Sequence, residues 1–391
     1  MTNIRSFLAE QASALLQERF GPGQGTRDIF VPGRVNLIGE HIDYHNLAVL
    51  PMAIGRGTCI VYRPSPDSTV RAVSTSEKTE SVFDLSSHER AKAGSWTNYL
   101  LAAKMIAQDG WQIKTGIDAA ISSNLPPAAG LSSSSALLVG FSIALLRANG
   151  IEPSVRELMD VLPEGEQFVG TRGGGMDHAA VLAAHPGCAL SINFSPLRLS
   201  PIPIPPGWRF LVAHSLTTAE KSGAMREKFN ALRIAGASAL RKLGMPSYAA
   251  ALKFYEEVPL DQLDEGERRV FRHVCEEGRR VDQAIDALQT NDFARFGRLL
   301  RQSHESLRDQ LRISNAAVDT LVETALQAGA GGARMTGAGF GGCVIILCCP
   351  HKVEQVQAAL RERYYAKQLN RFDPDNHLFI AEPSAGALID E

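Results

Sequence analysis

The sequence predicts an α+β protein built of two lobes, and three observations support this fold class. Segments of strand character alternate with helical segments, in an order typical of α+β lobes. The chain has 391 residues, more than one ordinary hydrophobic core accommodates. A proline-dense segment, 196–208, interrupts the pattern near the middle of the chain. We therefore place one lobe at residues 1–195 and the other at 196–391.

The elements expected in the first lobe follow from its apolar patterns. Residues 1–20 carry apolar side chains with charges interspersed, which predicts an amphipathic helix, and Glu10 interrupts the apolar segment that a signal peptide requires. The helix that starts near Ser132 has an interior apolar enough to be buried. In order, we expect a helix at 1–20, strands at 28–31, 49–62 and 117–122, a small-residue loop at 126–130, and a helix from about Ser132 to just before Gly150.

The second lobe begins with the proline-dense segment, which we expect to lack regular structure because proline fixes φ and removes a backbone donor. Long helical patterns follow it, and a glycine-rich turn then precedes an apolar strand. In order, we expect helices up to Gln327, a strand at 343–348, a helix at 353–367 and a final strand at 378–380.

Composition narrows the classes of partner and compartment. The net charge of −2 at pH 7 does not favour nucleic acid or an anionic membrane surface. The six cysteines form no CxxC pair and no His-linked spacing, which favours reduced thiols over disulfides or zinc. The longest strongly apolar run, 344–349, is far too short to span a bilayer. We therefore expect a cytoplasmic protein. The sequence does not fix the oligomeric state, and no exposed heptad pattern argues against a monomer.

The loop LPPAAGLSSSSAL, residues 125–137, is a candidate phosphate site. Its small residues let the backbone approach an anion, and the helix that follows offers unpaired N–H groups and the positive end of its dipole. The serines at 132–135 add hydroxyls that suit phosphate oxygens or Mg²⁺. The alternative is a serine cap on a buried helix, which needs one serine rather than four. A Walker-type loop is excluded, because the sequence contains no GxxxxGK[ST].

Two further loops are rich in glycine. GTRGGGMDH, residues 170–178, ends in the carboxylate of Asp177. The segment 333–347 places four glycines ahead of an apolar strand, and its alternative explanation is a purely structural turn. Three such loops in one chain indicate backbones that converge on a ligand, with Asp177 placed to take part in chemistry.

The stretch GRVNLIGEHIDYHNLAVLP, residues 33–51, gathers polar groups between apolar runs. Glu40, His41 and Asp43 can hydrogen-bond several hydroxyls of a polyol at once, which predicts a turn rather than a strand. His41, Asp43 and His45 also form an HxDxH string that could bind a metal, but no second ligand cluster accompanies it. The fixed charge of Arg34 suits a phosphoryl group in transfer, and a structural ion pair is the alternative.

Together these motifs resemble the GHMP small-molecule kinases and, within them, the galactokinases. GRVNLIGEHIDY matches the galactokinase signature, GLSSSSAL the second GHMP motif and MTGAGFGGC the third, while SWTNY at 95–99 resembles the segment near the adenine pocket. The resemblance extends over nearly the whole chain. It implies an N-terminal lobe like domain 2 of ribosomal protein S5 and a ferredoxin-like C-terminal lobe.

The resemblance also implies an activity, which is ATP-dependent and Mg²⁺-dependent phosphorylation of the anomeric hydroxyl of galactose. Asp177 and Arg34 are the expected catalytic residues; Asp177 is either a full general base or chiefly an electrostatic partner of Arg34. The expected sugar-binding residues are Arg34, Glu40, His41, Asp43, Gly174, Asp177 and Phe229. The expected nucleotide-binding residues are Trp96, Tyr99, Ala129, Gly130, Leu131, Ser132, Ser133, Ser134, Ser135 and Gly339. The expected Mg²⁺ ligands are Ser134, Ser135 and Glu166, with Glu164 as the alternative carboxylate.

Departures from the family pattern leave the sugar open. Ile42, the segment 172–175 and the extra serine are similar to the subgroup of eukaryotic-type galactokinases and N-acetylgalactosamine kinases. His178 replaces the usual Gln, and Phe229 stands where the family usually has a Tyr whose hydroxyl reaches the sugar. N-acetylgalactosamine, arabinose and uronic acids therefore remain alternatives to galactose, and a non-catalytic sugar sensor is the alternative to a kinase.

Overall fold

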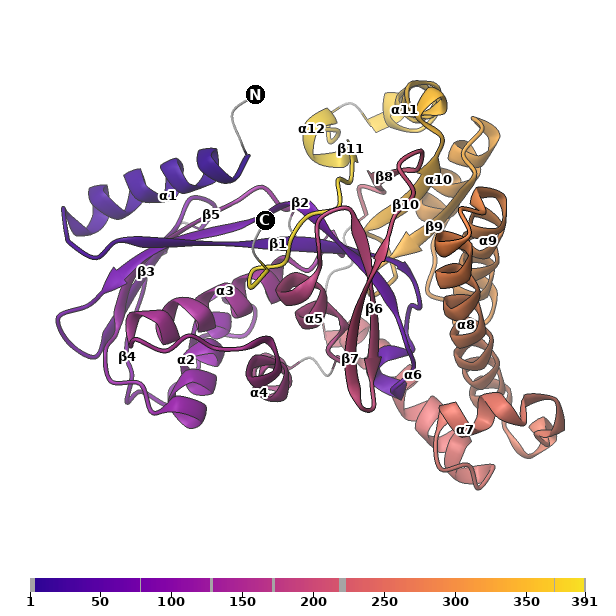
Figure 1. The fold of residues 1–391 in the computed structure, drawn as a ribbon, viewed down its shortest axis with the longest axis horizontal. Helices are drawn as coiled ribbons and strands as arrows, with labels where there is room; N and C mark the ends of the chain where they lie inside the picture. Colours follow the sequence, from indigo (N-terminus) through magenta and orange to yellow (C-terminus); the bar gives the residue numbers. More distant parts are fainter. Residues whose placement is uncertain are drawn as a thin grey trace.

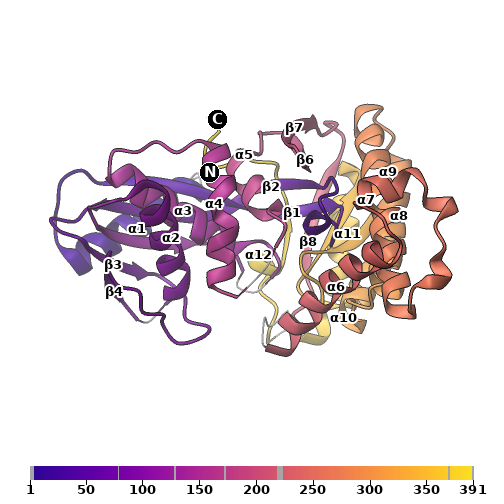
Figure 2. The ribbon, with the colours of Figure 1, turned by 90° about the horizontal axis from the view of Figure 1, so that it is seen from below.

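The computed structural model describes residues 4–77, 79–126, 129–170, 173–217, 223–368 and 370–389. It has two lobes that lie side by side along the long axis of the molecule, each with its own sheet (Figures 1 and 2). The predicted α+β class is therefore confirmed. Of the segment 172–175, which departs from the family pattern, residue 172 lies outside the described residues.

The N-terminal lobe contains a five-stranded sheet in the order β1-β2-β5-β3-β4. β3 pairs with β5 in parallel and the remaining neighbours are antiparallel. Its strands are β1 (Arg27–Ile38), β2 (Leu50–Pro64), β3 (Thr69–Ser74), β4 (Ser81–Asp84) and β5 (Ile117–Ser123).

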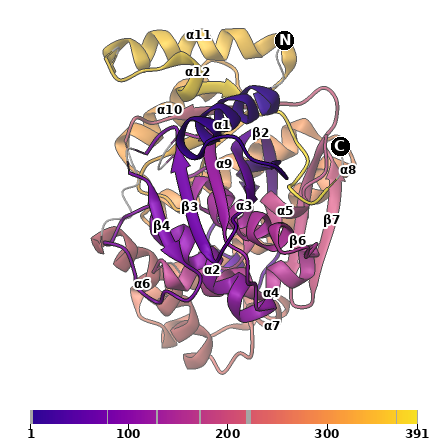
Figure 3. The same cartoon turned by 90° about the vertical axis from the view of Figure 1, so that its left-hand side faces the viewer.

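Helices cover both faces of this sheet, because successive side chains of a strand point to opposite faces. Cys59 and Val61 of β2 pack with α1, whereas Ile60 and Tyr62 belong to the main core on the other face. Figure 3 shows α1 on one side of the sheet and α2 and α3 on the other. The helices are α1 (Ile4–Phe20), α2 (Thr97–Trp111), α3 (Ser133–Ala148), α4 (Val155–Phe168) and α5 (Met176–Ala183), with the 3₁₀ turn η1 (Asp43–His45).

The C-terminal lobe contains a four-stranded antiparallel sheet in the order β11-β8-β10-β9. Helices lie between β8 and β9 and between β10 and β11, so the chain follows the βαββαβ order of a ferredoxin-like lobe, as expected. Its strands are β8 (Arg209–His214), β9 (Gly332–Thr336), β10 (Cys343–Cys348) and β11 (Leu378–Ile380). Its helices are α6 (Gly223–Lys242), α7 (Tyr248–Lys253), α8 (Glu265–Gln289), α9 (Phe293–Asp309), α10 (Ala316–Gln327), α11 (Val353–Arg363) and α12 (Pro374–His377), with 3₁₀ turns at η2 (Tyr255–Glu257), η3 (Leu260–Gln262), η4 (Pro350–Lys352) and η5 (Tyr365–Gln368).

The proline-dense segment corrects one expectation, since most of it is a strand. β7 (Leu197–Pro203) pairs with β6 (Cys188–Phe194) in a two-stranded hairpin between the lobes. In the described part of the chain β7 pairs with β6 alone, so its other edge forms no backbone hydrogen bonds with a strand. Prolines, which lack a backbone N–H, are tolerated in such an edge strand. β1 is also longer than the expected 28–31, because it continues through a register shift after Pro32 into the polar motif.

The two halves of the sequence do not separate cleanly in space. The hairpin of β6 and β7 spans the expected boundary at 195/196, and Val49 of the N-terminal lobe bridges to Ile192. After β11 the chain returns to the N-terminal lobe, where the N–H of Gly55 donates to Glu382 and that of Ser384 donates to Ala53 (Figure 1). The division at 195/196 stays a prediction.

Two general features concern the thiols and the helices. The six cysteines, all of which lie in the described ranges, are free thiols. Among the helices that the structure describes, none combines the length and the apolar character that crossing a membrane requires.

Candidate active site

An acidic side chain and a guanidinium meet where β1, the loop before α3 and the start of α5 come together. Nη2 of Arg34 lies 2.6 Å from Oδ1 of Asp177, and Nε of Arg34 donates to the same oxygen at 2.8 Å. Oγ of Ser132 donates to the other carboxylate oxygen at 2.6 Å. Nη1 of Arg34 donates to the carbonyl oxygen of Gly130 at 2.5 Å. The two side chains expected to be catalytic are therefore in direct contact, and the guanidinium also contacts the small-residue loop.

The surroundings of Asp177 favour its ionised form. Burial raises the pKa of this carboxyl, but the charge of Arg34 and the hydrogen bonds from Ser132 and Arg34 outweigh it, so the pKa lies below the ordinary value. The side chain of Asp177 is 27% exposed, whereas that of Arg34 is 5% exposed. The carboxylate therefore carries its charge at neutral pH and can be reached from outside, while its partner is enclosed.

Backbone geometry explains why these groups meet. The N–H of Arg34 donates to the carbonyl oxygen of Leu131 at 3.1 Å, which ties β1 to the loop before α3. Ser132 and Gly175, the residues before α3 and α5, have φ values of 62° and 97°. These left-handed conformations turn the chain sharply into each helix, so both helices begin beside the ion pair.

Glu40 lies in the turn that follows β1 and joins the two lobes. Its side chain is 2% exposed, and Oε1 lies 3.0 Å from Nη2 of Arg334 on β9. The same oxygen accepts a hydrogen bond from the N–H of Gly337 at 2.7 Å. A carboxylate expected to bind sugar is thus fixed by an arginine and a glycine of the third glycine-rich segment.

His41 follows with a φ of 61°, an uncommon conformation for a residue with a side chain. Its Nε2 lies 3.2 Å from the carbonyl oxygen of Ala338, so this nitrogen donates, and its Nδ1 lies 2.8 Å from the hydroxyl of Tyr44. Burial lowers the pKa of the ring to about 3, with the neighbouring His273 adding to the effect. The imidazole is therefore neutral, and Nδ1 accepts from the tyrosine hydroxyl.

Asp43 faces the loop that leads into α5. Its Oδ2 accepts from the N–H of Gly174 at 3.0 Å. A Cβ on Gly174 would lie 2.3 Å from the backbone of Asp43 and of Tyr44, so only glycine permits this approach. Burial raises the pKa of Asp43 to about 6, and the charge of Asp177 adds to the rise. The two carboxylates are therefore close enough to sense each other.

The HxDxH string does not converge on one point. His41 binds Ala338, Asp43 binds Gly174, and the ring of His45 packs at 4.7 Å from that of Tyr248. Within the described ranges no group of three or more His, Cys, Asp or Glu side chains could hold a metal ion. The turn expected around Glu40, His41 and Asp43 is present, and it continues into the 3₁₀ turn η1.

Phe229 on α6 completes this cluster from the second lobe. Its ring centroid lies 5.2 Å from that of His41 and 5.6 Å from that of Tyr44. The aromatic side chain expected to contact sugar is therefore packed against the polar turn, and it presents no hydroxyl there.

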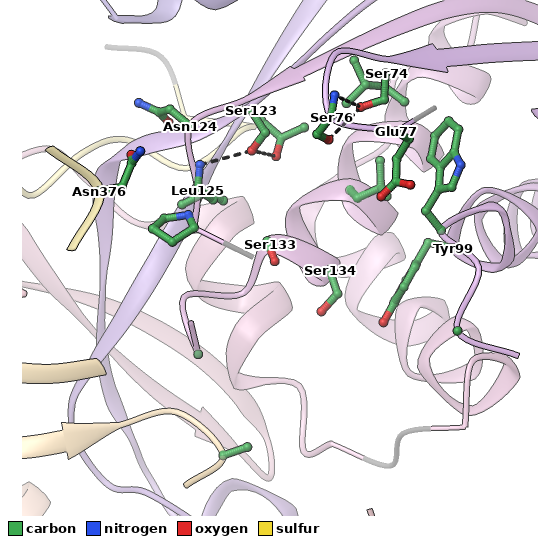
Figure 4. Close-up of a pocket in the computed structure, with 18 of the residues that line it drawn as sticks. Ser74, Ser76, Glu77, Tyr99, Ser123, Asn124, Leu125, Ser133, Ser134 and Asn376 are labelled. Atoms are coloured by element: carbon green, nitrogen blue, oxygen red, sulfur yellow. Dashed lines mark hydrogen bonds between the residues drawn. The ribbon is translucent and has the colours of Figure 1, made fainter. Parts of the chain in front are cut away.

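A cavity of about 950 Å³ opens beside the ion pair. Of the residues expected to bind nucleotide, Trp96, Tyr99, Gly130, Ser133, Ser134 and Gly339 line it. In Figure 4, Ser133 and Ser134 lie between Tyr99 and Glu77 on one side and Asn124 and Asn376 on the other. The other expected residues, Ala129, Leu131, Ser132 and Ser135, are buried and are not among the described residues that line the cavity.

The third glycine-rich segment closes onto the small-residue loop. Gly337 has a φ of 88°, and a Cβ on it would lie 2.8 Å from the carbonyl oxygen of Gly130. Gly339 has a φ of 89° and lies against Ile313 in the same way, at 3.0 Å. These contacts need the backbone freedom of glycine, so the turn is both structural and part of the cavity wall.

Comparison with known proteins places this site in a family. Profiles for the galactokinase galactose-binding signature, the N-terminal domain of GHMP kinases and the C-terminal domain of GHMP kinases match residues 15–64, 98–185 and 284–366. A galactokinase of Actinobacillus pleuropneumoniae is 32% identical over 348 residues, which are 86% of this chain and 88% of the relative. A galactokinase of Chloroflexus aggregans is 36% identical over 360 residues, 89% and 90% of the two chains. The chain belongs to the galactokinase family of GHMP kinases.

A solved structure of the family supports the same assignment. The crystal structure of Lactococcus lactis galactokinase complexed with galactose superposes with a TM-score of 0.88 at 27% identity, over 96% of this chain and 98% of that one. The galactokinase fold therefore extends over nearly the whole molecule.

The residues expected to bind Mg²⁺ in this galactokinase-family chain occupy different surroundings. Ser134 lines the cavity, whereas Ser135 is 2% exposed and is not among the described lining residues. Glu166 near the end of α4 has a carboxylate oxygen 3.4 Å from Nε2 of His178 and lies beside Gly173. Hydroxyl and carboxylate oxygens are the donors that Mg²⁺ prefers, so Ser134 and Glu166 fit this ion chemically.

Sequence reasoning missed several residues of this galactokinase-family site. One missed residue, Arg334, did have a signal in the sequence, because it is a lone arginine in an apolar segment just before the third motif. Asn124 and Asn376 line the cavity but have no local pattern that would single them out. Arg56 holds both of them, since its Nη1 donates to the carbonyl oxygen of Asn124 at 3.2 Å and to Oδ1 of Asn376 at 3.0 Å.

Proposed function

We propose that this chain transfers the γ-phosphoryl group of ATP to the anomeric hydroxyl of galactose. The observation that carries the proposal is the carboxylate of Asp177, held ionised by Arg34 and Ser132 between the cavity and the polar turn. Its relatives from Actinobacillus pleuropneumoniae and Chloroflexus aggregans are galactokinases, and the Lactococcus lactis structure contains galactose. The site and the relatives support the same reaction.

In this proposal ATP occupies the cavity, with its adenine near Trp96 and Tyr99 and its phosphates along Gly130, Ser133 and Ser134. The start of α3 supplies unpaired N–H groups and the positive end of a dipole, which suit phosphate oxygens. Ser134 and Glu166 would hold Mg²⁺, which when bound neutralises charge on the phosphates.

The sugar is proposed to lie against the polar turn, bound by Glu40, His41, Asp43 and the backbone of Gly174, with Phe229 at its side. The side chains of Glu40, His41 and Asp43 are buried and pre-organised, and their carboxylate and imidazole groups suit hydroxyls. Phosphoryl transfer depends mainly on positioning and charge, which is what such a rigid cluster supplies.

Asp177 is proposed to orient the anomeric hydroxyl and accept its proton, while Arg34 stabilises charge on the phosphoryl group. The guanidinium is fixed by Asp177 and by the carbonyl oxygen of Gly130, so its position is set before substrate arrives. A carboxylate with a lowered pKa is a weak base, so orientation of the hydroxyl is the larger part of this role.

The test is release of ADP by the purified protein with ATP, Mg²⁺ and one sugar at a time. Galactose, N-acetylgalactosamine, arabinose, glucuronate and glucose form the panel, and kcat/KM is compared among them. We expect the highest value for galactose, with phosphate on the anomeric oxygen of the product. A higher kcat/KM for N-acetylgalactosamine than for galactose would make N-acetylgalactosamine the preferred substrate. No ADP release with any sugar would favour a non-catalytic sugar sensor.

We also propose that the protein is a cytoplasmic monomer. Its six free thiols support a reducing compartment. Size-exclusion chromatography with light scattering tests the monomer directly, since a dimer would double the 42.3 kDa mass of the chain.

A further inference from the structure

The turn that carries Glu40 and His41 contacts a set of buried polar residues in the second lobe. We call this set the buried network; its members are His273, Glu277 and Arg280 on α8, Ser303 and Ser306 on α9, and Arg334 on β9. Each is no more than 9% exposed. The network lies more than 200 residues away from the turn in sequence, yet it contacts the turn directly.

Three residues of the network bond the backbone of the turn or of the end of β1. Oε1 of Glu277 accepts from the N–H of Gly39 at 2.9 Å, and it also accepts from Oγ of Ser303 at 2.7 Å. Nε2 of His273 lies 2.9 Å from the carbonyl oxygen of Glu40. Nη1 of Arg334 donates to the carbonyl oxygen of Leu37 at 2.8 Å. The backbone is thus held at Leu37 and Gly39, which precede Glu40, and at Glu40 itself.

The proton positions on His273 follow from its partners. A carbonyl oxygen only accepts, so Nε2 carries the hydrogen that is donated to Glu40. Burial lowers the pKa of the ring to about 4, so the imidazole is neutral at pH 7. Nδ1 therefore accepts from the hydroxyl of Ser306, which lies 2.9 Å away. The carbonyl oxygen of Glu40 thus fixes the tautomer, and the hydroxyl of Ser306 on α9 pairs with the second ring nitrogen and orients the ring.

The turn needs such support because its backbone is strained. His41 adopts a left-handed conformation, with a φ of 61°, which is unfavourable for a residue with a side chain. Such conformations persist where the surroundings over-determine them. Gly39, with a φ of 102°, lies so close to α8 that a Cβ would meet Val281 at 3.0 Å. Loss of the network bonds would let this strain relax and move His41.

We propose that His273 and Glu277 are positioning residues for sugar binding, which hold Gly39 and Glu40 from the second lobe so that Glu40 and His41 face the sugar. The inference rests on the proposed function. Neither residue is among the described residues that line the nucleotide cavity, so their loss should leave ATP binding unchanged. A substitution of Arg334 would be less informative. Arg334 pairs with the carboxylate of Glu40, which also binds Gly337 beside the cavity, so its loss could disturb both sites.

The test compares galactose affinity by isothermal titration calorimetry with the separate KM values for galactose and ATP. We expect His273→Leu and Glu277→Leu to raise the Kd and KM for galactose about tenfold or more, equal to about 1.4 kcal/mol, with the KM for ATP within about twofold. His273→Gln keeps a donor for Glu40 and should stay within about threefold. The control is Glu256→Gln, which removes an exposed ion pair to Arg279 on α8 and should change neither constant.

A purely structural role predicts a different result. Equal increases in the KM for both substrates, or an unchanged galactose Kd in folded leucine variants, would overturn the proposal. Should the leucine variants fail to fold, Ser306→Ala removes one hydroxyl, and we expect about a threefold rise in galactose Kd because the ring of His273 loses the hydrogen bond that orients it. An unchanged Kd there would also overturn the proposal. If the wild-type protein itself neither binds galactose nor releases ADP, the proposed function fails instead.

Discussion

Replacement of Asp43 by asparagine is expected to stabilise the folded protein at pH 8 and to weaken sugar binding at the same time. Asp43 is buried, and its pKa is raised to about 6 from its ordinary 3.8 by that burial and by the nearby charge of Asp177. Its ionised form is therefore unfavourable in the folded protein. Asparagine has the same shape, carries no charge, and can still accept the hydrogen bond from the N–H of Gly174.

The magnitude follows from the two pKa values. The difference between about 6 and 3.8 is about 2.2 pKa units, which at about 1.36 kcal/mol for each unit corresponds to about 3 kcal/mol. Because the folded pKa is the higher one, this cost to the free energy of unfolding is fully present above about pH 6. It disappears as the pH falls toward 3.8, where the carboxyl of Asp43 is protonated in both states.

The assay is urea unfolding of wild type and Asp43→Asn at pH 8 and pH 5, without ligand. The variant should be more stable by up to about 3 kcal/mol at pH 8, with a smaller gain at pH 5. Asp160→Asn, which changes an exposed carboxylate of α4, is the control and should show no such dependence on pH. A variant less stable than wild type at pH 8, or a gain of the same size at both pH values, would refute the argument.

The same substitution should harm the reaction, because the ionised carboxylate only accepts hydrogen bonds whereas the amide also donates. We expect the KM for galactose to rise in Asp43→Asn at pH 8. In the wild type it should rise as the pH falls through about 6, where Asp43 takes up a proton. A galactose KM that stays constant from pH 8 to pH 5 would place Asp43 outside the sugar site.

Four further substitutions test other parts of the site. Asp177→Asn should lower kcat by about 10²–10⁴-fold and leave ATP affinity nearly intact, and near-wild-type turnover would exclude its role. Arg34→Lys should also lower kcat, since a point charge cannot bond Asp177 and Gly130 as the planar fork does; unchanged kinetics would count against it. Gly174→Ala should raise the KM for galactose or unfold the protein, because its Cβ would lie 2.3 Å from backbone atoms, while Gly110→Ala meets nothing within 4 Å and serves as the control in a thermal melt. Phe229→Tyr should lower the KM for galactose by about two- to tenfold if the added hydroxyl bonds the sugar, and a higher KM would show that it points elsewhere.

Local signals in the sequence were enough for some elements and for much of the site. The strands at 343–348 and 378–380 have the expected bounds, because each is a short apolar run with clear ends. The loop before α3 was predictable, since small residues followed by a long apolar helix allow few alternatives. The contact between Arg34 and Asp177 was expected from the family resemblance rather than from spacing, as 143 residues separate them.

Other features have no local signature. β7 was expected to be irregular because its prolines argue against a central strand, and only the three-dimensional arrangement shows that it lies in an isolated hairpin. The bonds of Glu40 to Gly337 and of His273 to Glu40 join residues 297 and 233 positions apart. No periodicity in a window of helix or strand length reports such pairs. Burial therefore decides which charged residues belong to the site, and burial is a property of the fold.

The return of the chain to the first lobe has a consequence for the order of events during synthesis. The N–H groups of Ser384 and Gly386 donate to the carbonyl oxygens of Ala53 and Ala184, and a Cβ on Gly386 would lie 2.4 Å from the backbone of Leu182. The segment that contains Ser384 and Gly386 is synthesised only after the strands and helices of the second lobe. Until this segment leaves the ribosome, the carbonyl oxygens of Ala53 and Ala184 lack these donors. The first lobe therefore cannot form these backbone hydrogen bonds while the chain is still being synthesised.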